Sequence, residues 1–284
     1  MTRSTAHIPR VLSIAGSDSG GGAGIQADLR AFARAGVHGM TAITAVTAQN
    51  TVDVAAVHPI PGEIIVEQVR AVVDDIGVDA VKIGMLGDLA TIAAVDTALD
   101  LVGHAPVVLD TVMVAESGAA LLEPDARQEL ARRIVPRATV VTPNLPEARE
   151  LVGAPPDADA ESLARAVHDL GPGAVVVTGG HAPDPEDVFF DGEALVRIPV
   201  ERHSDGAAHG SGCTHSSVLA ARLALGDSPL EAARAARVIA SEAVRDGLHD
   251  IGSGAGPVNV LGLRPPGGDQ PPARSEPIGQ PKAV

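Results

Sequence analysis

The residues best suited to chemistry in this chain stand where a glycine-rich turn runs into a helical pattern, in the segment 209–215. Its Gly-Ser-Gly sequence places backbone N–H groups at a helix start, where they form a nest for a phosphoryl oxygen. Cys213 follows in the first turn, where the positive end of the helix favours the thiolate form. A base at this position would accept the proton of an attacking hydroxyl group, so the segment predicts phosphoryl transfer.

Two other interpretations of this segment stay open. Cys213 is the single cysteine of the chain, and a buried structural thiol behind an ordinary capped helix would need no chemistry. A zinc site is the third interpretation, with His203, His209, Cys213 and His215 as ligands. The intervals between these residues match no standard zinc-ligand spacing, which makes zinc the weakest of the three.

A second glycine-rich segment, Gly16–Gly24, lies between a predicted strand and a predicted helix. Its five glycines let the backbone approach a ligand closely, although a plain tight turn is an alternative. It is not a Walker loop, because Gly22 and Ala23 stand where Lys and Ser or Thr are needed, and Ile25 breaks the dinucleotide fingerprint. Asp28, one turn into the helix, either accepts hydrogen bonds from a ligand or favours the positive helix end.

Polar side chains also follow three other predicted strands. Asn144 and Glu147 are three residues apart on one helical face, where they could hold hydrated Mg²⁺ beside a nucleotide phosphate. The same two residues fit a capping box, and the sequence alone does not decide between these interpretations. Asp110 adds a carboxylate at a strand end, and Gln49 adds one donor and one acceptor unless it is ordinary surface.

The elements that position these residues alternate along the chain. The apolar runs typical of buried strands are 11–15, 42–48, 80–83, 107–109, 139–142 and 174–178, and helical patterns cover 25–35, 62–75, 89–102, 126–134, 161–170, 211–225 and 229–245. This alternation predicts an α/β fold with a doubly wound, mainly parallel sheet and helices on both faces. The runs 188–190 and 195–199 flank Asp-Gly and predict a small antiparallel hairpin at one edge.

The chain shows no repeat and no internal linker, so residues 1–263 are expected to form a single domain. Six of the 22 prolines fall in the 21 residues 264–284. Such a segment cannot bury enough apolar surface to offset its ordering entropy, so a disordered tail is expected.

Composition excludes several classes of protein. The 21 basic against 36 acidic residues give a net charge of −15, which argues against nucleic acid or anionic lipid as a partner. No apolar run approaches the ~18 residues that a membrane span requires. A single cysteine and an N-terminus without a secretion signal indicate a cytoplasmic protein that handles small molecules.

The order of these segments resembles that of the hydroxymethylpyrimidine/phosphomethylpyrimidine kinases of thiamine biosynthesis. The similar segments, in register over about residues 11–260, are 15–29, 47–51, 82–86, 109–113, 142–148, 179–181 and 210–214. The resemblance implies a ribokinase-like three-layer sandwich and, in most members, a homodimer. It also implies transfer of phosphate from ATP with Mg²⁺, first to the pyrimidine's hydroxymethyl group and then to the monophosphate.

Site residues carry over from the family's motifs position by position. The resemblance assigns the pyrimidine pocket to Gly16, Asp28, Gln49, Met85 and Val112, with the Gln49 amide pairing with the aminopyrimidine edge. It assigns the transferring phosphoryl group to Gly210, Ser211, Gly212 and Cys213, the last in the position of the base. Nucleotide contacts fall to Asn144, Thr178, Gly180 and Thr214, and Mg²⁺ to Asp110 and Glu147.

This chain departs from the family's pattern near the phosphates. Ser211 replaces the usual Thr, which is a mild change, and the residues before His209 lack the usual polar run. Thr178 stands where relatives carry Lys, and Lys82 and Lys282 are the only lysines of the chain. The departures keep two alternatives open, namely a pyridoxal or pyridoxine kinase of the same fold and a catalytically weak pyrimidine-binding relative.

Overall fold

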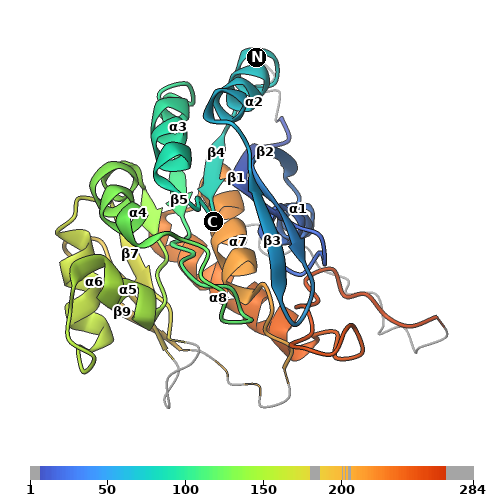
Figure 1. Cartoon of the computed structure of the whole chain (residues 1–284). Coiled ribbons are helices and arrows are strands. Elements are labelled where there is room, and N and C mark those ends of the chain that lie inside the picture. The colour runs from blue at the N-terminus through green and yellow to red at the C-terminus, as the bar shows by residue number, and fades with distance from the viewer. Residues whose placement is uncertain (1–6, 180–185, 200, 202, 204–205, 267–284) are drawn as a thin grey trace, which may run out of the picture.

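The computed structural model describes residues 7–179, 186–199, 201, 203 and 206–266 (Figure 1). Its strands are β1 (Arg10–Asp18), β2 (His38–Gln49), β3 (Val54–Pro59), β4 (Ala80–Ile83), β5 (Val107–Leu109), β6 (Val140–Val141), β7 (Val175–Val177), β8 (Glu186–Phe190) and β9 (Leu195–Pro199). Its α-helices are α1 (Gly24–Ala35), α2 (Gly62–Asp75), α3 (Leu89–Leu99), α4 (Pro124–Glu129), α5 (Leu145–Val152), α6 (Ala160–His168), α7 (Ser211–Ala224) and α8 (Pro229–Arg245). The predicted domain over 1–263 and tail over 264–284 stay predictions, because residues 267–284 lie outside the described part.

The strands pair into one nine-stranded sheet in the order β3-β2-β1-β4-β5-β6-β7-β8-β9. The pairs from β2 to β7 are parallel, as predicted from the alternation of strands and helices. All four residues of β4 are buried, because helices cover both faces of the sheet at its centre. The predicted antiparallel hairpin is confirmed as β8 and β9 at one edge.

The opposite edge of the sheet carries a strand that the sequence analysis missed. Strand β3 pairs antiparallel with β2, from the pair Ala45 and Pro59 to the pair Gln49 and Val54. Almost all of its residues are exposed, and its sequence Val-Ala-Ala-Val-His-Pro shows no alternation of apolar and polar residues, only a four-residue apolar run that does not by itself identify a strand. The parallel core therefore ends in antiparallel strands on both sides.

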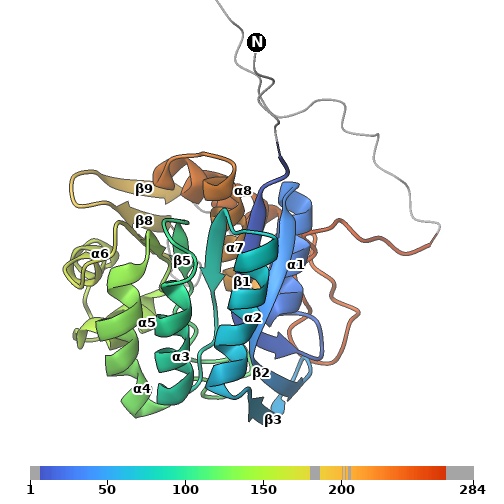
Figure 2. The same cartoon turned by 90° about the horizontal axis from the view of Figure 1, so that it is seen from above.

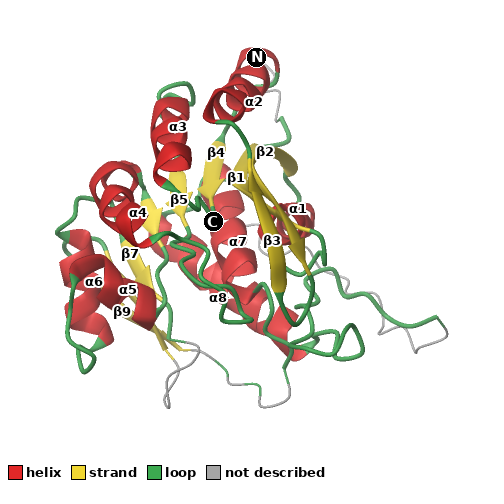
Figure 3. Cartoon of the chain, viewed as in Figure 1, coloured by secondary structure: helices red, strands yellow, loops and turns green. Residues whose placement is uncertain are grey.

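Helices form a layer on each face of the sheet, which confirms the three-layer arrangement (Figures 2 and 3). Helices α2 to α6 contribute to one core cluster, which includes Ile65, Ile92 and Leu163. Helices α1, α7 and α8 contribute to a second cluster on the other face, which includes Phe32 and Leu219. No helix in the described ranges is long and apolar enough to cross a membrane.

The predicted helix over 126–134 differs from the structure. The α-helical part is α4, and residues 130–134 form a π-helical turn followed by a 3₁₀ turn over 135–137. Pro136 has no N–H group to continue an α-helical ladder, and the changed hydrogen-bond spacing brings the chain into β6.

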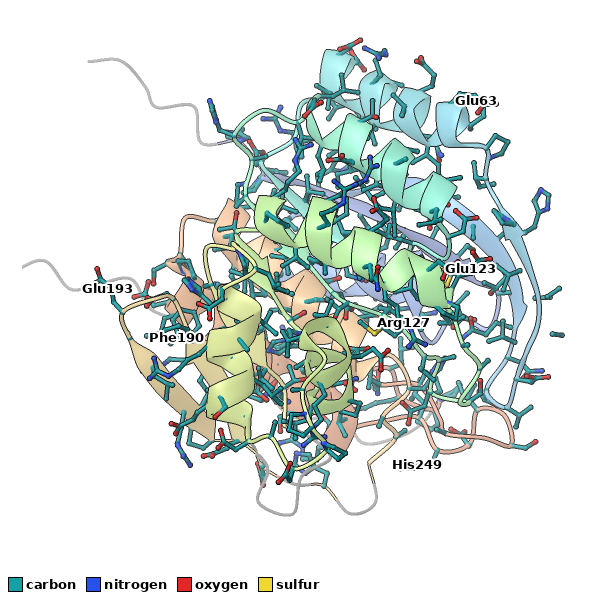
Figure 4. The ribbon with its side chains drawn as sticks, turned by 60° about the vertical axis from the view of Figure 1, so that its left-hand side comes forward. Glu63, Glu123, Arg127, Phe190, Glu193 and His249 are labelled. Atoms are coloured by element: carbon teal, nitrogen blue, oxygen red, sulfur yellow. The ribbon has the colours of Figure 1, made fainter. Side chains whose placement is uncertain are left out.

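The β8–β9 edge is covered by helix α6. Phe190, labelled in Figure 4, lies on β8. Its ring meets the ring of His168 edge-on, with centroids 5.1 Å apart. The guanidinium carbon of Arg165 lies 4.6 Å from the centroid of the Phe190 ring, which adds a cation–π contact. These contacts fix the strand that carries Asp187, a residue of the site described below.

A buried network of charged and polar side chains joins strands β1 and β4 to helices α1 and α7. The Lys82 Nζ on β4 lies 2.9 Å from Asp28 Oδ1 on α1 and 3.6 Å from Asp110 Oδ2 after β5. The Asp28 carboxylate also accepts hydrogen bonds from Ser13 (2.6 Å) and Ser217 (2.7 Å). Burial alone would lower the pKa of Lys82, but the carboxylates of Asp28 and Asp110 raise it above its ordinary value, so the amine stays charged.

Removing the lysine from this network should destabilise the fold. We expect Lys82→Met to lower the free energy of unfolding by about 3–5 kcal/mol, because it leaves buried carboxylates without their cation. Urea unfolding followed by circular dichroism measures the change. The exposed pair of Arg70 and Glu67 provides the control, since Arg70→Gln should cost less than about 1 kcal/mol.

The double variant Lys82→Met with Asp28→Asn separates charge from packing. It should recover part of the lost stability, because the unpaired carboxylate is removed with the lysine. A Lys82→Met chain that unfolds within about 1 kcal/mol of the parent would contradict the role of the ion pair.

Candidate active site

The carboxyl ends of the parallel strands enclose a cavity of about 210 Å³. Most of the residues singled out in the sequence line this one cavity. These lining residues are Gly16, Gln49, Met85, Asp110, Val112, Asn144, Glu147, Thr178, Gly210, Ser211, Gly212 and Cys213. In an open α/β sheet this edge is where ligands bind, so the cavity is the candidate active site.

One end of the cavity is formed by strands β1 and β2 and the segment after β4. Gly16 leaves room for Met85, because a Cβ atom added to Gly16 would lie 2.6 Å from Met85 Cε. Gln49 ends β2, where its backbone N–H donates to Ser19 Oγ at 2.8 Å. Its side-chain Oε1 accepts from Thr47 Oγ1 at 3.3 Å, while its Nε2 has no hydrogen bond to the described residues. The Gln49 amide is therefore oriented and keeps donor capacity for a ligand.

The glycine-rich loop after β1 is organised by one carboxylate. Asp18 accepts hydrogen bonds from the backbone N–H groups of Gly20 (2.8 Å), Gly22 (2.9 Å) and Ala23 (2.8 Å). It also lies 3.2 Å from His209 Nε2, which ties this loop to the one before α7. Burial alone would raise the pKa of Asp18, but these hydrogen bonds hold it below its ordinary value, so the carboxylate stays ionised.

The loop before α7 packs against that glycine loop through its backbone. Gly210 has φ +83°, and a Cβ atom there would overlap the carbonyl oxygen of Gly22. Helix α7 starts at Ser211, whose N–H donates to the Ala208 carbonyl oxygen at 2.9 Å, and Gly212 and Cys213 of its first turn line the cavity. Nothing lies within 4 Å of the Cβ position of Gly212, which leaves space above these N–H groups. The predicted anion nest therefore fits the geometry of this turn.

Cys213 lies in this turn, half-buried, and its charge state differs from the expectation. The helix position predicts a stabilised thiolate, whereas burial, together with the charges of Asp110 and Asp28, raises the pKa of the Cys213 thiol to about 12. The Lys82 ammonium acts in the opposite direction and is outweighed. The helix end alone therefore does not make a thiolate here, and Cys213 is a neutral thiol at physiological pH.

Two carboxylates face the cavity between β5 and α5. Glu147 accepts from Thr111 Oγ1 at 3.0 Å and forms a capping box with Asn144, which confirms the capping-box interpretation, while the Mg²⁺ interpretation stays a prediction. Burial, with a smaller contribution from Asp110, raises the pKa of Glu147 to about 7. Burial also raises the pKa of Asp110, which accepts from Ser216 Oγ at 2.9 Å. Carboxylate oxygens are hard donors of the kind that hydrated Mg²⁺ prefers, so the residues present fit that ion.

Some predicted site residues lie elsewhere. Asp28 is fully buried in the network with Lys82 and does not line the cavity. Thr214 is buried as well, and its Oγ1 has no hydrogen-bond partner among the described residues. Gly180 lies outside the described part of the chain. The zinc interpretation finds no support, because the described residues include no cluster of His, Cys, Asp and Glu side chains fit for a metal.

Several lining residues were not singled out in the sequence as parts of a site. Lys82 reaches the cavity from the middle of an apolar strand, and a lysine between Val81 and Ile83 is a signal that a buried partner must exist. Arg237 also lines the cavity and pairs with the buried Asp187. Neither offers such a signal, because Arg237 fits the periodicity of its helix and Asp187 lies in a strand of mixed polar and apolar residues. The hydrogen bond between Arg237 and Asp187 forms only because α8 packs against the sheet.

The state of Cys213 can be tested by alkylation, since the chain has one cysteine. We expect slow modification by iodoacetamide at pH 7, with a rate that keeps rising through pH 10, because the reactive thiolate forms only near the pKa of about 12. Mass spectrometry of the intact chain measures the rate, and Cys213→Ser is the control. A rate that levels off near pH 8 would contradict the raised pKa.

An anion nest, a carboxylate pair and a neutral thiol in one cavity of a doubly wound sheet define a small-molecule phosphotransferase. A family model described as phosphomethylpyrimidine kinase matches residues 18–259. The hydroxymethylpyrimidine/phosphomethylpyrimidine kinase of Rhizobium meliloti is 49% identical over 255 residues, which cover 87% of this chain and 95% of the relative. The chain therefore belongs to the phosphomethylpyrimidine kinase family.

Solved structures agree with this assignment. The phosphomethylpyrimidine kinase of Clostridium difficile superposes with a TM-score of 0.74 at 37% identity, covering 83% of this chain and 99% of that one. The pyridoxal kinase of Staphylococcus aureus in complex with AMP-PCP gives a TM-score of 0.82 at 32% identity, covering 90% and 94%. The fold is thus the ribokinase-like sandwich expected from the sequence, and the chain is a kinase.

Proposed function

We propose that the chain phosphorylates 4-amino-5-hydroxymethyl-2-methylpyrimidine and then its monophosphate, giving the pyrimidine diphosphate used in thiamine biosynthesis. In the first step the hydroxymethyl oxygen forms a bond to the γ-phosphorus of ATP, and the bond from that phosphorus to the β,γ-bridging oxygen breaks, releasing ADP. The observation that carries this proposal is that Gln49 and Cys213, far apart in sequence, line one cavity. Family membership supports the same reaction.

The pyrimidine would lie at the end of the cavity formed by Gly16, Met85 and Val112. The Gln49 amide can donate through Nε2 and accept through the free lone pair of Oε1, which matches the donor and acceptor on an aminopyrimidine edge. Gly16 leaves the space for a flat ring, and Met85 and Val112 supply apolar contacts. Recognition is thus a polar contact at one edge of the ring and apolar contacts beside it.

The transferring phosphoryl group would lie over the first turn of α7. The N–H groups of Gly212 and Cys213, in the first turn of α7, would donate to the phosphoryl oxygens as charge develops on them, whereas the Ser211 N–H already donates to the Ala208 carbonyl oxygen at 2.9 Å. Asn144 and Thr178 are joined by a β-bridge on the nucleotide side of the cavity. The phosphate chain then runs between the α7 start and the α5 start, both of which are helix N-termini.

Asp110 and Glu147 would hold Mg²⁺, which when bound neutralises charge on the nucleotide phosphates and on the two carboxylates. An offset charge on Asp110 removes one of the causes that raise the pKa of Cys213. The Lys82 ammonium then lowers the pKa of the thiol against less opposition. Cys213 is the side chain placed to accept the hydroxyl proton, and Mg²⁺ held by Asp110 and Glu147 would favour its thiolate form.

A direct assay tests the substrate. We expect ATP-dependent formation of the mono- and diphosphate by mass spectrometry, with kcat/KM for hydroxymethylpyrimidine at least about tenfold above that for pyridoxal. A tenfold preference corresponds to roughly 1.4 kcal/mol of transition-state binding, which one matched hydrogen bond supplies. Cys213→Ala serves as the control and should lose about 10²–10⁴ in kcat with pyrimidine affinity retained.

The outcome of this assay separates the alternatives. Faster turnover of pyridoxal would favour the pyridoxal kinase alternative, to which the structural likeness to pyridoxal kinases points. Tight pyrimidine binding without turnover would favour a catalytically weak relative. Absence of both would overturn the proposed substrate.

Substitution of the recognition amide tests the pyrimidine pocket. We expect Gln49→Leu to raise the KM for hydroxymethylpyrimidine about 10–100-fold, because the ring's polar edge loses its partner. The KM for ATP should change by less than about twofold, since no nucleotide contact is removed. Gln128→Leu, on the exposed face of α4, is the matched control. An unchanged pyrimidine KM in the Gln49 variant would remove this residue from the pocket.

We further propose that the chain acts as a cytoplasmic homodimer, as the resemblance implies. A lone half-buried thiol is compatible with a reducing compartment. The exposed apolar side chains of Val46 and Val57 on the β2–β3 edge support a contact between copies.

A further inference from the structure

The nucleotide side of the cavity is short of positive charge. Carboxylates of Asp18, Asp110, Glu116 and Glu147 line the cavity. Among its described lining residues, only Lys82 and Arg237 carry a permanent positive charge. A nucleoside triphosphate brings several more negative charges, which must be offset before it can bind among these carboxylates.

Lys82 cannot supply that charge to a ligand alone. Its side chain is 0% exposed, and its ammonium lies between Asp28 (2.9 Å) and Asp110 (3.6 Å). The positive charge of Lys82 is therefore largely offset within the protein. The N–H groups that can reach a phosphate must come from elsewhere.

Arg237 is placed differently. Its side chain on α8 is 13% exposed and lines the cavity together with Thr178. The Nε group donates to Asp187 Oδ2 at 2.6 Å, and this is the only hydrogen bond that Arg237 makes within the described ranges. The carboxylate thus fixes one edge of the guanidinium and leaves the two Nη groups free to bind a second anion.

Position 178 and Arg237 meet at the same carboxylate. The backbone N–H of Gly179, next to Thr178, donates to Asp187 Oδ1 at 3.1 Å, and Asp187 is fully buried. Asp187 therefore holds the Arg237 guanidinium close to the backbone of Thr178 and Gly179. Its fork geometry matches two oxygens of a phosphate.

A second polar group points to a ligand at this end. His215 on α7 lines the cavity with its side chain 3% exposed, and its Nε2 lies 3.8 Å from Asp187 Oδ2 without a hydrogen-bond partner among the described residues. Burial, together with the charge of Arg237, lowers the pKa of His215 well below 6.5, so the ring is neutral. A buried ring nitrogen without a partner is costly unless a bound molecule completes its hydrogen bond.

We propose that Arg237, held by Asp187, binds the phosphate chain of the nucleotide and supplies the cation that Thr178 does not. The inference rests on the proposed function for the identity of the ligand, a nucleoside di- or triphosphate. It explains how a chain with threonine at position 178 can hold a polyanion. In this proposal the buried carboxylate of Asp187 orients the Arg237 guanidinium.

Calorimetric titration of the full chain with ADP and with adenosine tests the proposal. Arg237→Met should weaken ADP binding about 10–100-fold and leave adenosine binding unchanged, because only ADP carries phosphates. Arg237→Lys should retain part of the ADP affinity, since a point charge replaces the fork. Arg234→Met, on the exposed face of the same helix, is the matched control and should bind ADP like the parent.

A double variant separates contact with phosphate from simple compensation of Asp187. If Arg237 only neutralises the acid, Asp187→Asn combined with Arg237→Met restores ADP affinity, and the proposal is overturned. If Arg237 contacts phosphate, the double variant stays impaired. Equal losses for ADP and adenosine, or a parent chain that binds ADP no better than adenosine, also overturn it.

These titrations use no pyrimidine, so they are independent of the substrate. Loss of ADP affinity in Arg237→Met alongside inactivity toward pyrimidines would uphold this inference and sink the proposed substrate. Pyrimidine turnover with unchanged ADP affinity in the variant would do the reverse.

Discussion

The pairing of Lys82 with Asp28 and Asp110 is the interaction on which the rest of the structure depends. It stands at the centre of the sheet, where charges are costly unless each has its partner. The network joins β4 to α1, and through Ser217 it reaches α7 as well. The two helices that bring the glycine loop and the anion nest to the cavity are therefore held by one set of charges beneath it.

The same network sets the electrostatics of the cavity above it. Asp110 belongs both to the buried network and to the carboxylate pair with Glu147, so its charge influences the pKa values of Lys82, Cys213 and Glu147. A cation bound by Asp110 and Glu147 would therefore lower the pKa of the Cys213 thiol without contacting it. Positive charge for the ligand then has to come from the far side, where Asp187 orients Arg237.

Sequence alone predicted the parts that rest on local signals. Helical periodicity located α2 and α8 to the residue, and the capping pair Asn144 and Glu147 marked the start of α5. The exposed strand β3 has an apolar run too short to identify it, and the π-helical turn had no signal of its own. Cys213 shows the limit most clearly, because the helix dipole is a local property, whereas the burial that raises its pKa is tertiary.

The hydrogen bond between Asp18 and His209 delays the assembly of the cavity during synthesis of the chain. The two residues are 191 positions apart, and the loops they tie meet backbone to backbone at Gly22 and Gly210. During synthesis, the glycine-rich loop after β1 cannot make these contacts until the loop before α7 has also been made, which requires most of the chain. The cavity can therefore bind a ligand only when the fold is nearly complete. A ligand that binds this cavity stabilises the complete fold relative to partly folded forms.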